Sequence, residues 1–418
     1  MADEKIETAF EAAMASGKVN GAIVCATDVD GNFTYNYLAG ERTLLSGDKV
    51  PQALDDMLCL ASATKLIAAV AVLQGVEDGL FTLDEDITKF APAGPVLARQ
   101  SVLTDKEDES GEQVLKPRDD SRPITLEMLL SHTAGTAYHF LEPKVGKWHE
   151  KNMGPPLKEG ETRPVEEAFA YPLAFQPGTG WMYGTGIDWA GRILEIAEGK
   201  TLGDHIRERI AKPLGIDPDD AQFYPVKGEH VRKRLVDLNP QDPLGAGKAV
   251  VGALVGDSIN TRSKGCFGGH GLFMTAQGYM KVLHSLLAND GKLLRKETVE
   301  KMFQNHVGPD AAKHFDDMFN GPAGHFFRVG TDGTKVGFGL SALLTLEDVE
   351  GWYGKGTLTW GGGLSFAWFI DPKNGLCGLC AIQASISDYD VNLLTSLKNT
   401  FRHDVYRKRA AWKEGTKQ

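Results

Sequence analysis

SATKLIAAVAVLQGVEDGL, residues 62–80, is a run rich in Ala, Leu, Ile and Val with one internal glycine. This composition favours a helix that is buried on most of its sides, and it predicts an end near Gly79. Ser62 and Lys65 stand at the start of this helix, where a spacing of three residues places both side chains on one face. A helix so apolar needs other elements around it, so the sequence on either side of it decides the fold.

The flanking sequence carries strand patterns. Residues 20–40 contain two β-rich runs around an Asp-Gly-Asn turn and predict a hairpin. Runs within 337–346, 356–371 and 375–383 also predict strands, and a final amphipathic helix follows at 390–410. We expect the late strands to pair with the early hairpin. This order of elements indicates an α+β fold, in which helices flank an antiparallel sheet.

A change in the sequence pattern in the middle of the chain predicts an insertion. Residues 86–230 show short helical patterns broken by Pro and Gly, and the charged segment 104–123 is too polar to belong to a core. We therefore expect one α/β sandwich domain built from residues 1–85 and 231–418. The inserted region, residues 86–230, is expected to be mainly helical.

Composition excludes several classes of function. The formal charge of −11 is spread over mixed signs, and no basic block is present to bind nucleic acid. The first residues are acidic where a signal peptide is basic, and no apolar run is long enough to span a membrane. Five scattered cysteines make a disulfide framework improbable. We expect a cytoplasmic protein with reduced thiols, without nucleic-acid or membrane partners.

No metal or cofactor is expected from the sequence. Cys377 and Cys380 form a C-x-x-C, but they lie in a predicted strand, where positions three apart point to opposite faces. The eleven histidines include no H-x-x-x-H pair that would offer a local metal template.

The best candidate for chemistry is the pair Ser62 and Lys65. A second S-x-x-K, Ser46 to Lys49, lies in a turn that gives its two side chains no fixed relation. A serine hydroxyl needs a base and nearby positive charge to act as a nucleophile, and both Lys65 and the helix N-terminus supply positive potential. Taken alone, Ser62 also fits a helix cap followed by a solvated lysine.

Two further segments favour the catalytic interpretation. Tyr183 precedes a helical run in a Gly-rich turn, which can hold a phenol at the edge of a cleft. Gly361 to Gly363 interrupt a predicted strand, where glycine weakens packing unless a ligand or backbone approaches closely. The Gly363 N–H is therefore a candidate oxyanion donor. A buried tyrosine and a β-bulge are the alternative interpretations.

These segments together resemble a known family, which comprises class C serine β-lactamases, D,D-peptidases, and esterases and acyltransferases of the same fold. Its signatures S-x-x-K, Y-x-N and K-T-G are matched in order by Ser62 to Lys65, Tyr183 to Thr185, and Trp360 to Gly362. The segments LLSHTAGTAYHF and CFGGHGLFMT also resemble family elements. The similarity covers essentially the whole chain and is strongest with fungal acyltransferases of the lovastatin pathway. It implies the β-lactamase/transpeptidase-like fold with an all-helical insert.

The resemblance also implies a mechanism. Tyr183 and Lys65 would share removal of the Ser62 proton, and the N–H groups of Ser62 and Gly363 would bind the oxyanion. An ester or thioester would donate the acyl group to a hydrophobic alcohol in fungal secondary metabolism, with an acyl-carrier domain of a synthase as a possible donor.

Departures from the family motifs narrow the substrate. Trp360 stands where lactamases carry a lysine, and Thr185 replaces an asparagine, so esters are more plausible substrates than lactams. A carboxylesterase is the main alternative, followed by a weak lactamase or D-peptidase, and then by a catalytically silent binding module.

Some neighbouring residues stay ambiguous from sequence alone. An apolar substrate pocket could be lined by aromatic residues near the motifs, and the candidates are Tyr138, Phe140, Trp360 and Tyr389. They fit a core equally well. His132 lacks any spacing that supports a Ser-His-Asp triad, and we expect it to be structural.

Overall fold

A computed structural model describes residues 4–416, except 45–47, 91, 110, 112, 155–156, 159, 225–228, 238–259, 261–262, 322–332, 364 and 385–389. Within these residues the main sheet has nine antiparallel strands. The order is β10-β11-β12-β13-β14-β1-β2-β3, and β8 also pairs with β2. The strands are β1 (Val19–Asp28), β2 (Thr34–Leu44), β3 (Lys49–Pro51), β8 (Val236–Asp237), β10 (Val336–Phe338), β11 (Leu343–Thr345), β12 (Leu358–Gly362), β13 (Phe366–Asp371) and β14 (Leu376–Ala384).

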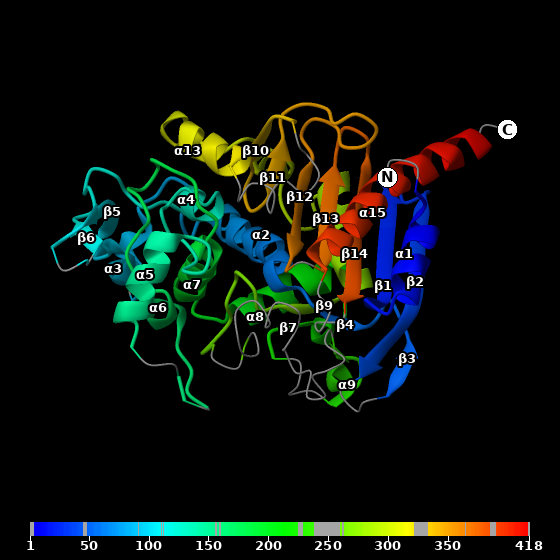
Figure 1. The fold of residues 1–418 in the computed structure, drawn as a ribbon, viewed down its shortest axis with the longest axis horizontal. Coiled ribbons are helices and arrows are strands. Elements are labelled where there is room, and N and C mark those ends of the chain that lie inside the picture. Colours follow the sequence, from blue (N-terminus) through cyan, green and yellow to red (C-terminus); the bar gives the residue numbers. More distant parts are fainter. Residues whose placement is uncertain are drawn as a thin grey trace.

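The predicted hairpin and its pairing with the late strands are confirmed. β1 and β2 are joined by a turn in which Gly31 adopts a left-handed conformation, with φ of +71°. β1 then pairs along its length with β14, and Val24 lies opposite Cys380. The two ends of the chain therefore meet in the middle of one sheet (Figure 1).

Helices cover both faces of this sheet. On one face, α1 (Ile6–Ala15) and α15 (Val391–Gly415) pack in an apolar cluster that includes Cys380 (Figure 1). The other face is covered by α11 (Ala276–Ala288) and the larger core that includes Cys377. Cys377 and Cys380 thus point to opposite faces, as the strand prediction required. All five cysteines are unpaired, buried thiols.

The apolar helix that begins near Ser62 lies between the sheet and the insert (Figure 1). A 3₁₀ turn, Ala61–Ala63, leads into α2 (Thr64–Glu77), and every residue from Thr64 to Gly75 is buried. The helix ends at Glu77 with Asp78 as its C-cap, and Gly79 follows with φ of +75°, so the end lies near Gly79 as predicted. Ser62 itself lies in the 3₁₀ turn just ahead of the α-helix.

The remaining helices surround this frame. Those within 86–230 are α3 (Ala93–Ala98), α4 (Leu126–Leu130), α5 (Pro143–Asn152), α6 (Val165–Ala168), α7 (Gly186–Glu198), α8 (Leu202–His205) and α9 (Glu229–Arg232), the last crossing the expected boundary. α12 (Lys296–Met302) and α13 (Pro309–Asn320) follow α11. α7 packs directly on α2.

The expectation of an all-helical insert needs a correction. Within the charged segment, β5 (Val102–Glu107) and β6 (Gln113–Lys116) form a hairpin. Its acidic side chains are bridged to α5, because Lys144 lies 2.9 Å from Asp105 and Lys147 lies 2.9 Å from Glu107. Paired strands satisfy the backbone without needing an apolar face, so the sequence pattern gave no sign of them.

A second, three-stranded sheet crosses the expected boundary of the insert. β9 (Phe273–Thr275) pairs with β4 (Met57–Cys59) on one side and with β7 (Ala221–Gln222) on the other. The end of the inserted segment is therefore attached to the sandwich. The division into residues 1–85 with 231–418 and residues 86–230 remains a proposal.

Candidate active site

Ser62 and Lys65 lie together as their spacing predicted. The Lys65 ammonium donates a hydrogen bond of 3.4 Å to Ser62 Oγ. Lys65 is fully buried at the start of α2, whereas Ser62 is partly exposed. Ala61, directly before Ser62, adopts φ of +45°, a conformation that is strained for a residue with a β-carbon. Such local strain is typical of a backbone that must hold a functional side chain in a fixed place.

Lys65 has two further partners from distant parts of the sequence. It donates 2.6 Å to the carbonyl oxygen of Gly269 and 3.0 Å to the phenol oxygen of Tyr138. A buried ammonium needs such acceptors, because its loss of hydration is otherwise very costly. The three bonds together hold the charge of Lys65 next to the Ser62 hydroxyl.

Tyr183 meets Lys65 through the face of its ring. Lys65 Nζ lies 4.6 Å from the Tyr183 ring centroid, a cation–π arrangement. Trp360 Nε1 donates a hydrogen bond of 3.3 Å to the Tyr183 hydroxyl. Tyr183 is 6% exposed, so its ring is packed inside an aromatic cluster. The ring does not lie at the edge of a cleft, and that expectation is wrong. The close aromatic neighbours exclude water from most of its surface.

Tyr138, expected only as a pocket residue, is a direct partner of Lys65. Burial, and after it the negative charge of Asp188, holds the pKa of the Tyr138 hydroxyl well above its usual value. Tyr138 therefore stays a neutral phenol at physiological pH. Its ring also packs edge-on against Tyr183, with centroids 5.5 Å apart.

The third motif reaches the nucleophile through β12. Gly362 lies so close to the backbone before Ser62 that a β-carbon there would be 1.9 Å from the Leu60 carbonyl oxygen. Only glycine fits at that position. Gly363 follows with φ of +54°, also a conformation that favours glycine. The close approach of Gly362 places the end of β12 beside the 3₁₀ turn that carries Ser62. The role of the Gly363 N–H as an oxyanion donor remains a prediction.

The other predicted pocket residues differ in how far they are buried. Trp360 is 7% exposed and packs on Tyr183, with ring centroids 5.1 Å apart. Phe140 is 49% exposed and stacks on the ring of Tyr138 at 5.0 Å. Tyr389 lies outside the described residues.

His132 supports the loop that carries Tyr183. It is buried, adopts φ of +61°, and accepts the Gly184 N–H through Nδ1 at 3.3 Å. Its ring meets the Tyr183 ring edge-on at 4.8 Å. Burial, and after it the charge of Lys65, lowers the pKa of His132 well below its usual value, so the imidazole is neutral. These contacts agree with the structural role that the sequence suggested.

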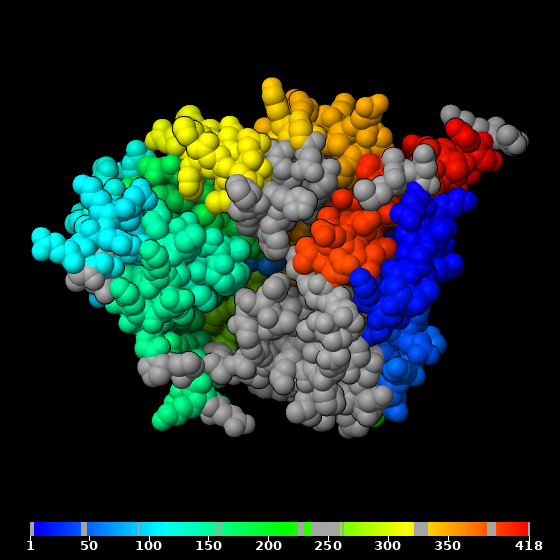
Figure 2. All heavy atoms as spheres, in the orientation of Figure 1, coloured from blue at the N-terminus to red at the C-terminus, as the bar shows by residue number. Residues whose placement is uncertain are grey.

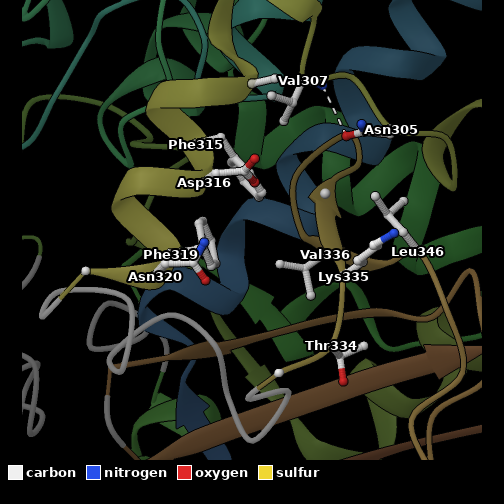
Figure 3. Close-up of a pocket in the computed structure, with 14 residues that line it drawn as sticks. Asn305, Val307, Phe315, Asp316, Phe319, Asn320, Thr334, Lys335, Val336 and Leu346 are labelled. Carbon is white, nitrogen blue, oxygen red and sulfur yellow. Dashed lines mark hydrogen bonds between the residues drawn. The ribbon is translucent and has the colours of Figure 1, made fainter.

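Figure 2 shows a hollow near the middle of one face, between the insert and the sheet, with atoms in the blue of α2 at its base. A separate cavity of about 750 Å³ lies between α13 and β10 (Figure 3). Phe315 and Phe319 line that cavity and pack on Trp181, whose ring contacts His132. Among the described residues that line it, none is a partner of Lys65.

Among the residues whose placement is described, no group of three or more His, Cys, Asp or Glu side chains is arranged to hold a metal ion. None of the helices in the described ranges has the length together with the apolar character that a membrane span requires.

Three contacts of the site were missed by sequence reasoning. The Gly269 carbonyl, the Tyr138 hydroxyl and the indole N–H of Trp360 were not expected as partners of Lys65 or Tyr183. Gly269 lies in the segment CFGGHGLFMT, which resembled a family element. The sequence therefore marked this segment but did not indicate that its backbone binds Lys65. The pairing of residues this distant in sequence depends on the tertiary fold.

The chain belongs to the Beta-lactamase family, whose model matches residues 6–393. It is 56% identical over 411 residues to a lovastatin esterase from Penicillium rubens, covering 98% of this chain and 99% of that protein. It is 35% identical to monacolin J acid methylbutanoyltransferase from Aspergillus terreus, over 96% of this chain and 95% of the relative. Its fold matches a mutant of simvastatin synthase from Aspergillus terreus with a TM-score of 0.81 at 34% identity, covering 97% and 98% of the two chains.

The recognition from motifs is therefore confirmed, as is the β-lactamase-like fold. Relatives named as esterases and as acyltransferases both cover nearly the whole chain, so this is an enzyme of the branch that moves acyl groups between esters, alcohols and water. The serine acyl-enzyme mechanism is the one that fits this family.

Proposed function

We propose that this enzyme cleaves an ester of a small acyl group with a bulky, apolar polyketide alcohol, through an acyl-enzyme on Ser62. The observation that carries the proposal is the hydrogen bond of 3.4 Å from the Lys65 ammonium to Ser62 Oγ, inside a site where that ammonium is fully buried. A hydroxyl held by a buried cation is favoured as an alkoxide when its proton leaves.

The proposed cycle has two halves. Ser62 Oγ attacks the ester carbonyl carbon, its proton passes to the Tyr183–Lys65 unit, and a tetrahedral oxyanion forms between the N–H groups of Ser62 and Gly363. Collapse of this intermediate breaks the bond to the alcohol, which leaves with the proton. Water then attacks the acyl-serine in the same way and releases a carboxylic acid and free Ser62.

Water is proposed as the final acceptor because of the balance of similarities. Identity to the lovastatin esterase is 56%, against 35% to the methylbutanoyltransferase, with nearly complete coverage in both cases. Acyl transfer to an alcohol uses the same acyl-serine and is the second candidate. The similarity to the transferases, together with aromatic side chains around Tyr183, supports it.

We further propose that the donor and the alcohol are small molecules, with an acyl-carrier domain as a further candidate donor. A cytoplasmic location stays a prediction.

The test uses the full chain with a methylbutanoyl ester of a decalin alcohol. Intact-mass spectrometry should detect wild-type protein carrying the acyl group, and chromatography should detect the free acid and alcohol. Ser62→Ala should give neither. Ser285→Ala is the matched control, because Ser285 lies on the distant helix α11 and its hydroxyl also bonds a charged neighbour, Asp290, at 2.7 Å. Continued acylation of Ser62→Ala would contradict the proposal.

A further inference from the structure

Asp188 is a buried carboxylate next to the proposed site. It lies in the first turn of α7, five residues after Tyr183, and is completely shielded from solvent. A buried carboxylate requires strong local compensation, because it loses its hydration. The N-terminus of α7 supplies part of it, since the helix dipole favours negative charge there.

One oxygen of Asp188 accepts a hydrogen bond from Gly269, the residue whose carbonyl binds Lys65. The Gly269 N–H donates to Asp188 Oδ1 at 2.8 Å, while the carbonyl of the same residue accepts from Lys65 Nζ at 2.6 Å. A β-carbon on residue 269 would lie 2.2 Å from Asp188 Oδ2, so the carboxylate and the glycine fit against each other closely. The position of one acceptor of Lys65 is thus fixed by Asp188.

A second route leads from Asp188 to Lys65 through Tyr138. After burial, the charge of Asp188 is the largest cause that raises the pKa of Tyr138. Asp188 Oδ2 is buried and has no hydrogen-bond partner among the described residues, so Asp188 acts on Tyr138 through its charge. A phenol that stays protonated can accept from Lys65 without competing for the Ser62 proton.

We propose that Asp188 is a positioning residue, which holds the Lys65 ammonium against Ser62 by fixing the position of Gly269. The inference rests on the proposed acyl-serine chemistry and deepens it. The hydrogen bond of Asp188 reaches Gly269 and not Ser62. Its loss should therefore slow acylation with little change in substrate binding.

The surroundings of Asp188 decide what a pH measurement reports. His270 Nδ1 lies 3.6 Å from Asp188 Oδ1, and the charge of Asp188 raises the pKa of the phenols of Tyr138 and Tyr171. Lys65 and Tyr183 are one contact further away, through Gly269 and Tyr138 respectively. Removal of a negative charge lowers the pKa of acids nearby. The pH profile of acylation should consequently move to lower pH.

The experiment compares Asp188→Asn and Asp188→Ala with the wild type. Asparagine keeps an acceptor for the Gly269 N–H but loses the charge, whereas alanine loses both. Single-turnover acylation by a p-nitrophenyl ester should slow by about 10-fold in Asp188→Asn and about 100-fold in Asp188→Ala, with KM changing far less. Asp371→Asn is the matched control, because Asp371 is equally buried and accepts a glycine N–H at 2.8 Å, that of Gly354, elsewhere in the fold.

The outcomes separate three cases. The positioning role would be overturned if Asp188→Asn is acylated as fast as Asp371→Asn. It would also be overturned if Asp188→Asn is acylated more slowly while its pH profile stays where that of the wild type lies. A wild-type enzyme that never forms an acyl-serine would overturn the proposed function instead. If Asp188→Ala does not fold, Asp188→Asn alone decides, with its thermal unfolding measured beside that of the control.

Discussion

Lys65 Nζ lies 4.6 Å from the centroid of the Tyr183 ring, so the ammonium faces the π surface of this phenol. A cation over an aromatic face in a desolvated site is a stabilising contact. It also couples the two residues electrostatically, because the charge of the ammonium acts directly on the phenol beside it. Loss of either partner should therefore disable the same proton transfer.

Lys65→Met and Tyr183→Phe should each lower the rate of acylation by about 10²- to 10⁴-fold, since each removes part of one proton-transfer unit. The double variant should be little slower than the slower single variant. Single-turnover kinetics with a p-nitrophenyl ester measures all three. Losses that multiply in the double variant would show that Lys65 and Tyr183 act independently.

The elements that the sequence predicted correctly depend on local patterns. The Asp-Gly-Asn turn and the alternation around it specify the β1–β2 hairpin, and the apolar run after Ser62 specifies α2. The S-x-x-K spacing predicts the contact of Lys65 with Ser62, because both residues lie within one helical turn. Each of these features needs only residues that are close in the chain.

The features that escaped prediction join distant segments. Tyr138 is 73 residues from Lys65 and Gly269 is 204 residues away, and both meet its ammonium only after the fold is complete. The β5–β6 hairpin was missed for another reason, because its strands are largely solvated and lack the apolar alternation that marks a strand. Asp188 did carry a signal in the sequence, because a charged residue among apolar neighbours on a buried helix face indicates a specific role.

β-Lactams should be poor substrates. Trp360 occupies the position where lactamases carry a lysine, and it is buried against Tyr183 with its indole N–H donated to the Tyr183 hydroxyl. An indole offers no charge to hold a lactam carboxylate. We expect nitrocefin and penicillin G to be turned over at least about 100-fold more slowly than p-nitrophenyl butyrate, as kcat/KM. Comparable rates would mean that another residue supplies the missing cation.

Acid should destabilise the fold through a stacked histidine pair. The rings of His139 and His149 lie parallel, 4.0 Å apart. Burial, and after it the charge of His149, lowers the pKa of His139 from 6.5 to about 4, and burial also lowers the pKa of His149. Between pH 6.5 and 4 the unfolded chain therefore binds protons that the folded protein does not, and stability falls as pH falls.

The His149→Gln variant should weaken this acid dependence. Without a second imidazole against it, the pKa of His139 should rise toward its ordinary value, so fewer protons are taken up on unfolding. Urea unfolding at several pH values from 7 to 4.5 gives the slope. His230→Gln is the control, since His230 is 58% exposed and far more solvated. An unchanged slope in His149→Gln would place the acid sensitivity in other buried histidines, such as His132 and His205.

The last prediction concerns the competition between water and an alcohol for the acyl-serine. Both second steps begin from the same intermediate, so their ratio depends on how well an acceptor hydroxyl is held near the ester carbon and how well water is excluded. Because the identity to the esterase exceeds that to the transferase, we expect free acid to be the main product when a methylbutanoyl thioester and a decalin alcohol are supplied together. Some transferred ester should form, and its share should rise with the concentration of the alcohol, because the alcohol that leaves in the forward reaction can also return. Chromatography of both products over a series of alcohol concentrations measures the partition. A simple small alcohol such as ethanol is the control for acceptor recognition, since it reacts without needing a shaped pocket. Ester as the dominant product with several bulky alcohols, but not with ethanol, would move the enzyme to the transferase alternative while leaving the chemistry at Ser62 unchanged.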